Sequence, residues 1–131
     1  RTTAGIHKDD LDFRINGHPL KRFASQGQLK SFVLALKLSQ YEILRSEKNM
    51  PPLLLLDDIF DKLDHRRVTY LLELLTGQTF GQVFITDTHP ERLEGGVQQT
   101  GADYSLFRVE NGQATLAGQS FDPGSSKTDT P

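Results

Sequence analysis

A length of 131 residues corresponds to about one domain, enough to bury a core but near the lower end for an α/β enzyme. The formal net charge of −2 excludes a surface built throughout to coat nucleic acid, so any nucleic-acid contact has to be local. Without cysteine, the chain has neither a disulfide framework nor a thiolate metal site. No segment reaches the roughly 18 apolar residues of a membrane span, so we expect a cytoplasmic protein with no membrane partner.

The first part of the chain predicts a hairpin followed by a long helix. An Asn-Gly pair between two short stretches predicts a hairpin over residues 11–23. Over residues 25–48, apolar residues recur at helical spacing on a wide face, so this helix should be largely buried. Ser25 with Gln28 predicts a capping box at its start, and Asn49 before two prolines predicts its end.

The middle of the chain predicts a βαβ unit. The run "LLLLD" at residues 53–57 is typical of a parallel strand that is covered on both faces. A helix follows, from an Asp64 cap to Gly77. The run "QVFIT" at residues 82–86 then predicts a second strand, parallel to the first through a right-handed crossover.

The last part predicts a second hairpin and a tail. Residues 104–118 contain another Asn-Gly pair between two strand-like runs. Residues 119–131 are polar and rich in Pro, Gly and Ser, so we expect a disordered tail after one domain over residues 1–118. The predicted fold class is α/β, with parallel βαβ strands, a long buried helix and flanking hairpins.

Two adjacent carboxylates, Asp57 and Asp58, end the apolar run. In an open parallel sheet, ligands bind beyond the carboxyl ends of the strands. Successive residues of an extended chain point to opposite sides, so one carboxylate can hold Mg²⁺ while the other orients or deprotonates a nucleophile. The alternative is that Asp58 begins a turn and Asp57 caps local backbone groups.

The stretch "ASQGQLK", residues 24–30, lies at the start of the long helix. Gly27 would let a ligand approach the backbone closely, and the N–H groups and dipole of the helix end suit a phosphate. Lys30, the last residue of this stretch, could contribute charge to a phosphate path. The alternative is an ordinary helix N-cap at Ser25.

Together, "SQGQ" and "LLLLDDIFDKLD" resemble the signature motif and the Walker B strand with D-loop of ABC-type ATPases, in that family's order and interval. With "GIHKDDLDF", "NGHPLKRFASQGQLKSFVLALKL" and "GQVFITDTHPERL", residues 1 to about 110 are similar to the C-terminal part of the RecF family of DNA replication and repair proteins, relatives of the SMC and Rad50 heads. The resemblance implies the C-terminal lobe of an ABC-type ATPase head, with ATP and Mg²⁺ as ligands of the complete protein.

The resemblance also implies roles for the two carboxylates at the strand end. Asp57 matches the Walker B aspartate that supports Mg²⁺. Asp58 matches the position where most of the superfamily has the glutamate that polarises the attacking water. Because aspartate is shorter, it has to approach the water more closely or act through a second water, so slow hydrolysis is expected.

Other matching residues are expected at a subunit interface. The signature residues contact the γ-phosphate of ATP held by the opposite subunit of an ATP-dependent homodimer, and they correspond here to Ser25, Gln26, Gly27 and Gln28. The D-loop, between Asp61 and Asp64, runs along that interface, and Asp64 can also cap the next helix.

The position of His89 leaves two interpretations open. The switch histidine of this superfamily usually follows its strand immediately, whereas His89 comes two residues late after Thr86. Either the loop is longer and His89 still reaches the γ-phosphate, or Asp87 or Thr88 occupies that position and His89 is a solvated loop residue.

The resemblance implies a protein of the SOS response that binds DNA at single-strand/duplex junctions and helps load recombinase, with RecR and RecO as partners. A non-catalytic interaction module that keeps only the ATPase scaffold is the alternative. A phosphoacceptor receiver domain would also place paired aspartates at a strand end, but it needs a later strand-end lysine that "QVFITDTHPE" lacks.

The sequence contains no G-x-x-x-x-G-K-[ST] loop, the main anchor for nucleotide phosphates, and the resemblance therefore implies a C-terminal fragment lacking Walker A. We expect the purified 131-residue chain to bind ATP weakly and to hydrolyse none, as measured by calorimetric titration and phosphate release. Turnover that persists once contaminating ATPase is removed would contradict this expectation.

Overall fold

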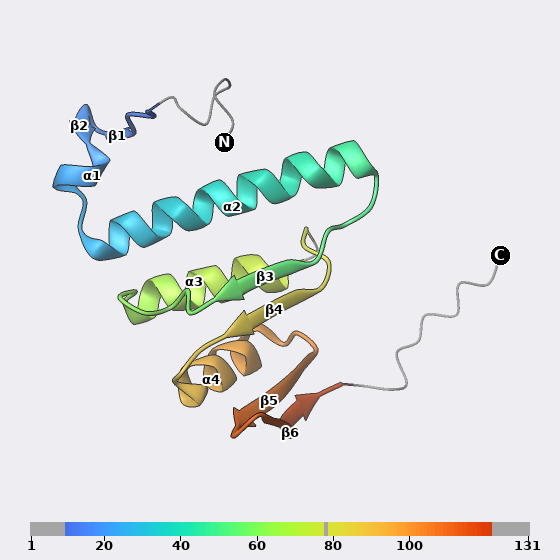
Figure 1. Cartoon of the computed structure of the whole chain (residues 1–131). Helices are drawn as coiled ribbons and strands as arrows, with labels where there is room; N and C mark the ends of the chain where they lie inside the picture. Colours follow the sequence, from blue (N-terminus) through green and yellow to red (C-terminus); the bar gives the residue numbers. More distant parts are fainter. Residues whose placement is uncertain (1–9, 78, 122–131) are drawn as a thin grey trace.

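The computed structural model describes residues 10–77 and 79–121, which form a mixed α/β structure (Figure 1). Three two-stranded sheets are present in this part of the chain. No helix within it is both long and apolar enough to cross a membrane. The elements, in chain order, are β1 (Arg14–Ile15), β2 (His18–Pro19), α1 (Leu20–Phe23), α2 (Gln26–Lys48), β3 (Leu54–Asp57), α3 (His65–Thr76), β4 (Val83–Thr86), α4 (Pro90–Thr100), β5 (Tyr104–Glu110) and β6 (Gln113–Ser120).

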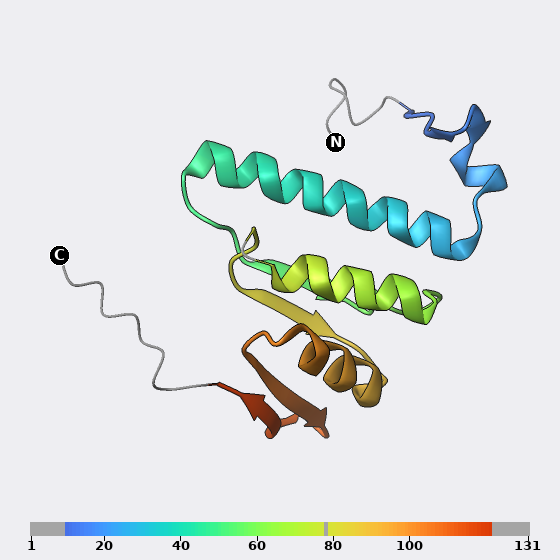
Figure 2. The ribbon, with the colours of Figure 1, turned by 180° about the vertical axis from the view of Figure 1, so that it is seen from behind.

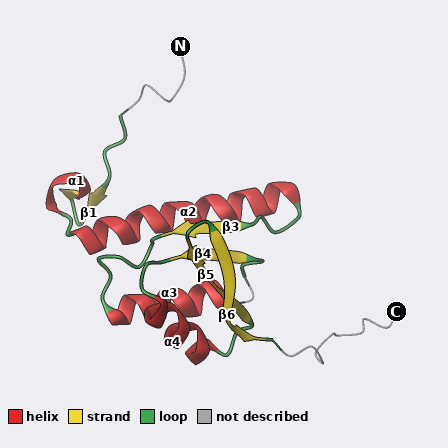
Figure 3. Cartoon of the chain, turned by 60° about the horizontal axis from the view of Figure 1, so that its bottom comes forward, coloured by secondary structure: helices red, strands yellow, loops and turns green. Residues whose placement is uncertain are grey.

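The parallel pair β3–β4 lies at the centre of the arrangement. Its register runs from Leu54 opposite Val83 to Asp57 opposite Thr86, as expected for the predicted βαβ unit. Helix α2 runs along the β3 side, and the β5–β6 hairpin lies beyond β4 next to α4 (Figures 1 and 3). Seen from behind, α3 lies over the strand pair (Figure 2). Because the two strands are parallel and their last residues are paired, both end at the same edge of the sheet.

Both predicted hairpins are confirmed, and their Asn-Gly pairs explain the turns. Asn16 and Gly17 have φ angles of 50° and 79°, and Asn111 and Gly112 have φ angles of 51° and 75°. Positive φ at both central residues is the requirement of the two-residue turn that suits twisted antiparallel strands. The first hairpin is short, because residues 20–23 turn into helix α1 instead of continuing a strand.

The ends of α2 are also confirmed. The N–H of Gln28 donates to Ser25 Oγ over 3.1 Å, and the N–H of Ser25 donates to Gln28 Oε1 over 2.9 Å, which completes the capping box. Asn49 ends the helix in a left-handed conformation, with φ of 53°.

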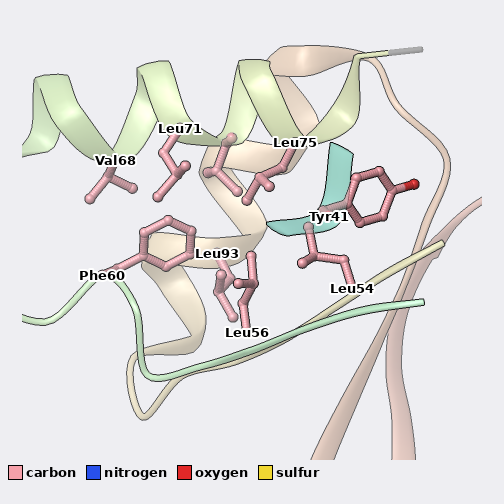
Figure 4. Close-up of a cluster of buried hydrophobic side chains, with 9 residues drawn as sticks. Tyr41, Leu54, Leu56, Phe60, Val68, Leu71, Leu75 and Leu93 are labelled. Carbon is pink, nitrogen blue, oxygen red and sulfur yellow. The ribbon is translucent and has the colours of Figure 1, made fainter. Parts of the chain in front are cut away.

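The core gathers between the strand pair, α3 and α4 (Figure 4). Alternate residues of β3 point inward, and helical spacing brings one face of α3 against them. Phe60 and Leu72 have no exposed surface, and one residue of α2, Tyr41, joins them. The full cluster is Tyr41, Leu54, Leu56, Phe60, Val68, Leu71, Leu72, Leu75 and Leu93.

Two expectations about burial are wrong for this chain. The strand at residues 53–57 is covered on one face only, since Leu54 and Leu56 are buried whereas Leu55 is 65% exposed. Helix α2 is largely exposed, with only Gly27 and Tyr41 buried. Both errors have one physical cause: in the described residues, the core that α3 and α4 form lies on a single side of the strand pair. The large apolar residues of α2 that remain exposed are Leu29, Val33, Leu36, Ile43 and Leu44.

One helix was missed and one boundary differs. Helix α4 begins at Pro90 and ends before Gly101, whose φ is 68°, and both are ordinary helix-end signals. The Gly95-Gly96 pair in its middle obscured the pattern, because glycine weakens helices. The predicted tail at 119–131 begins inside β6, which continues to Ser120, and its residues 122–131 lie outside the described residues.

The two glycines of α4 provide a matched test of the α3–α4 packing. A Cβ at Gly96 would overlap Leu72 of the core, whereas a Cβ at Gly95 would meet nothing within 4 Å. We therefore expect Gly96→Ala to lower the free energy of unfolding by about 1–2 kcal/mol, because a close-packed core resists added volume. Gly95→Ala should raise it by about 0.5–1 kcal/mol through helix propensity. Urea denaturation measures both, and equal effects of the two substitutions would contradict this packing.

Candidate functional site

The carboxyl ends of β3 and β4 bring predicted site residues together. Asp57 lies opposite Thr86, and the Thr86 hydroxyl donates a hydrogen bond to Asp57 Oδ1. The N–H of Asp58 donates to Thr86 O over 3.0 Å, so the two strands stay paired to their last residues. Both aspartates are exposed. The sheet edge therefore presents two carboxylates to solvent, as the sequence predicts.

Asp58 begins a turn, as the alternative interpretation stated. Its φ is 48°, a left-handed conformation that is uncommon outside glycine and redirects the chain after β3. Lys30 of α2 donates from Nζ to Asp58 O over 2.8 Å and lies 4.0 Å from Asp61 Oδ2. Lys30 thus binds the loop after β3, here called the 58–64 loop, to the start of α2. The turn leaves the Asp58 side chain exposed, so the two interpretations are compatible.

The start of α2 packs against the 58–64 loop through Gly27. A Cβ at this position would lie 3.1 Å from Lys62 O and 2.7 Å from Arg67 Nη1. Close packing between α2 and the 58–64 loop therefore requires a residue without a side chain at position 27. Its neighbours Ser25 and Gln28 serve the capping box predicted as the ordinary alternative, yet both remain exposed, as does Gln26.

Asp64 and Asp61 bracket the second half of this loop. The N–H of Arg67 donates to Asp64 Oδ1 over 2.9 Å, so Asp64 caps α3 as expected. Asp61 is half-buried and faces Lys30. The loop is therefore fixed at its start by the Lys30 side chain of α2 and at its end by its own Asp64 side chain, which accepts from the backbone of α3.

An ion pair that we did not predict follows β4. Both carboxylate oxygens of Asp87 accept hydrogen bonds from Arg92, over 2.9 Å from Nε and 2.7 Å from Nη2. The Asp87 side chain has no exposed surface. Burial alone would raise its pKa, but the hydrogen bonds from Arg92 and from the His89 N–H, with the Arg92 charge, outweigh burial, and the pKa lies below its ordinary value. The acidic residue five positions before an arginine was the only signal in the sequence.

His89 lies at the start of α4, two residues beyond Asp87. Its side chain is 65% exposed, and its N–H donates to Asp87 Oδ1 over 3.1 Å. Its ring nitrogen Nδ1 lies 3.1 Å from Thr88 Oγ1 and 3.3 Å from Arg92 Nη2. The loop after β4 therefore presents the His89 ring at the surface, three positions beyond the last residue of the strand.

Asp57 fits a role in magnesium binding only together with other ligands. No group of three or more His, Cys, Asp or Glu side chains that could hold a metal exists in residues 10–77 and 79–121. Mg²⁺ usually keeps several waters and binds one or two carboxylates plus substrate phosphates. One strand-end carboxylate facing solvent suits that mode, in which a nucleotide supplies the remaining oxygens.

Comparison with known proteins identifies relatives of this chain. No protein-family model matches the chain. It is 55% identical over 108 residues to the DNA replication and repair protein RecF of Flavobacterium johnsoniae, a match that covers 82% of this chain. It is 51% identical over 108 residues to RecF of Bacteroides fragilis, again over 82% of this chain. The chain spans about 30% of the length of these relatives.

Two solved structures of RecF also match this chain. A structure of the recombination mediator protein RecF with ATPrS in the RecFOR pathway matches with a TM-score of 0.60 and 34% identity, over 89% of this chain and 29% of that one. RecF with ATP matches with a TM-score of 0.53 and 31% identity, over 86% and 28%. The fold is therefore that of one part of the RecF structures solved with ATP or ATPrS. The chain belongs to the RecF family of DNA replication and repair proteins.

Because Asp87 is buried and paired with Arg92, we expect the free energy of unfolding to depend on pH. Because the pKa of Asp87 is lower in the folded chain than in the unfolded one, its ionisation stabilises the fold above pH 4, and this contribution disappears as the pH falls below about 4. We expect Asp87→Asn to lower the free energy of unfolding by about 2 kcal/mol at pH 7, since it leaves Arg92 unpaired. The deficit should shrink at pH 3.

Urea denaturation at several pH values measures this difference. Asp103→Asn, at an exposed position, is the matched control and should change stability by less than about 0.5 kcal/mol throughout. A deficit for Asp87→Asn that is the same at pH 3 and pH 7 would contradict the ion pair.

Proposed function

We propose that this segment works within a RecF-type ATPase, where it provides the carboxylates that serve Mg²⁺·ATP at the end of β3. The observation that carries the proposal is the shared strand edge, at which Asp57, Asp58 and Thr86 meet and to which Lys30 of α2 is bound. Ligand sites of parallel α/β sheets form at this kind of edge.

The two carboxylates have separate roles in this proposal. Asp57, held by the Thr86 hydroxyl, binds Mg²⁺ or one of its waters. Asp58, whose side chain leaves the strand in a left-handed turn, polarises the water that attacks the γ-phosphate. Its short side chain makes the hydrolysis slow, because the water has to lie closer than for glutamate or has to be reached through a second water.

The exposed residues at the start of α2 serve the second subunit. In an ATP-dependent homodimer, Ser25 and Gln28 would contact the γ-phosphate held by the partner, and the end of the helix would add its positive dipole. Lys30 and Asp61 would transmit the state of this contact to the 58–64 loop, because they connect α2 with that loop. Support comes from the exposure of Ser25, Gln26 and Gln28 beside a firmly anchored loop.

His89 is the candidate switch histidine in this proposal. Asp87 is unsuited to contact phosphate, because its carboxylate is buried against Arg92 and is negatively charged. His89 is exposed and can donate a hydrogen bond to an oxyanion.

The biological role proposed for the whole protein follows its relatives. They are described as DNA replication and repair proteins, and their solved members as recombination mediators in the RecFOR pathway. We extend this to ATP-controlled dimerisation on single-strand/duplex DNA junctions and recombinase loading in the cytoplasm, with RecR and RecO as partners and a place in the SOS response.

A non-catalytic interaction module remains the second candidate. The observation in its favour is the apolar surface around β3 and β4, where Leu53, Leu55 and Phe84 are exposed. Such a surface suits protein contact whether or not ATP is hydrolysed.

A chimera separates the two candidates. In the Flavobacterium johnsoniae relative, the 108 matched residues are replaced by those of this chain, and ATP turnover and ATP-dependent dimerisation are measured by phosphate release and light scattering. We expect Asp58→Asn to lower turnover at least about 100-fold while dimers persist, because it removes the group that polarises water. Ser25→Arg should abolish dimerisation, because it places a bulky cation where the partner's nucleotide binds.

Matched control variants are available in the same chain. Asp103→Asn removes an exposed carboxylate just before β5, and Ser39→Arg changes an exposed position further along α2. Neither should alter turnover or dimerisation. If Asp58→Asn and Ser25→Arg behave like these controls, the interaction module is the better account.

A further inference from the structure

Asp87 and Arg92 form a closed hydrogen-bonded unit with His89. The Asp87 carboxylate accepts from Arg92 Nε, from Arg92 Nη2 and from the His89 N–H. Its side chain has no exposed surface, and no buried side-chain polar atom in the described residues lacks a hydrogen-bond partner. A bidentate pair of this kind fixes the guanidinium plane as well as its position.

The fixed guanidinium faces one nitrogen of the His89 ring. Arg92 Nη2 lies 3.3 Å from His89 Nδ1, and the Thr88 hydroxyl lies 3.1 Å from the same atom. Arginine has donors and no acceptor, so the lone pair of Nδ1 is the group that matches it. Asp87 Oδ1 lies further from Nδ1, at 3.6 Å, and already accepts hydrogen bonds from Arg92 Nη2 and the His89 N–H. The neutral ring then carries its proton on Nε2, and that N–H is the group the exposed side chain can offer to a ligand.

Arg92 is also held from the side of the 58–64 loop. Its Nη1 lies 3.4 Å from Phe60 O, and Phe60 belongs to the fully buried core. The hydrogen bond with Asp87 raises the pKa of Arg92, and the negative charges of Asp61 and Asp58 raise it further. Arg92 is therefore charged, and it contacts the loop after β3 as well as Asp87.

We propose that Asp87 and Arg92 are positioning residues that hold the His89 ring with Nδ1 as acceptor and Nε2–H as the donor to an oxyanion, namely the terminal phosphate of ATP. The choice of oxyanion rests on the proposed function, whereas the fixed tautomer rests on the contacts above. Because Arg92 also touches the 58–64 loop, the same guanidinium couples the orientation of His89 to the carboxylate side of the site.

The test is the tautomer of His89 in the 131-residue chain, read from the imidazole ¹⁵N chemical shifts by long-range ¹H–¹⁵N spectroscopy near pH 8. We expect His89 to be almost entirely the Nε2–H form. His18 and His65, which are exposed and have no ring hydrogen bond within the described residues, should show a less extreme mixture and serve as internal references.

Substitutions then assign the cause. Arg92→Gln should move the His89 shifts toward those of His65, and Arg92→Lys, which keeps the charge without the bidentate fork, should do so partly. Arg66→Gln, at an exposed arginine of α3, is the matched control and should leave them unchanged. Backbone amide spectra report whether each variant is folded, and the wild-type comparison needs no variant at all.

The outcomes separate this inference from the proposed function. A His89 tautomer ratio equal to that of His65 in the wild-type chain, or one unmoved by Arg92→Gln in a folded chain, overturns the positioning role. No nucleotide takes part in this readout. A fixed tautomer alongside a chimera indifferent to Asp58→Asn and Ser25→Arg therefore supports the positioning role and overturns the proposed ATPase function.

Discussion

The parallel pairing of β3 with β4 is the constraint on which the candidate site depends. Because the register places Asp57 opposite Thr86, both strands end at one edge, and the loops that follow them start within hydrogen-bonding distance of each other. The same pairing turns Leu54 and Leu56 toward α3 and supports the buried core beneath that edge. A shift of one residue would turn these side chains to the exposed face and move Asp57 away from Thr86. Core and site therefore depend on one register.

Two cationic side chains connect the end of the β3–β4 pair with the surrounding helices. Lys30 reaches the 58–64 loop from α2, and Arg92 reaches it from α4. The loop also lies against Gly27, where any side chain would crowd Lys62 O. The start of α2, the carboxylates after β3 and the ring of His89 thus belong to one connected unit. This arrangement suits a site whose parts have to respond together when a phosphate binds.

Features that depend on neighbouring residues could be predicted from the sequence. Features that depend on contacts between distant parts of the chain could not. Capping residues, Asn-Gly turns and the apolar period gave the helix and strand bounds, because Ser25 or Gly17 acts on its own neighbours. Helix α4 was missed because Gly95 and Gly96 oppose helix formation, which tertiary packing on Leu72 overrides. Burial was overestimated for α2, since an apolar face in a sequence does not show which element covers it. The roles of Asp57 and Asp58 came from resemblance, whereas the Asp87–Arg92 pair required coordinates.

The central claim is that the carboxylates after β3 and the residues at the start of α2 serve two different subunits of one dimer. Mixing the Asp58→Asn and Ser25→Arg forms of the chimera tests it most directly, with light scattering to verify that mixed dimers form. If the sites are shared between subunits, each mixed dimer contains one intact site, and the mixture should regain turnover that neither form shows alone. Mixed dimers that form and regain no turnover would contradict the account.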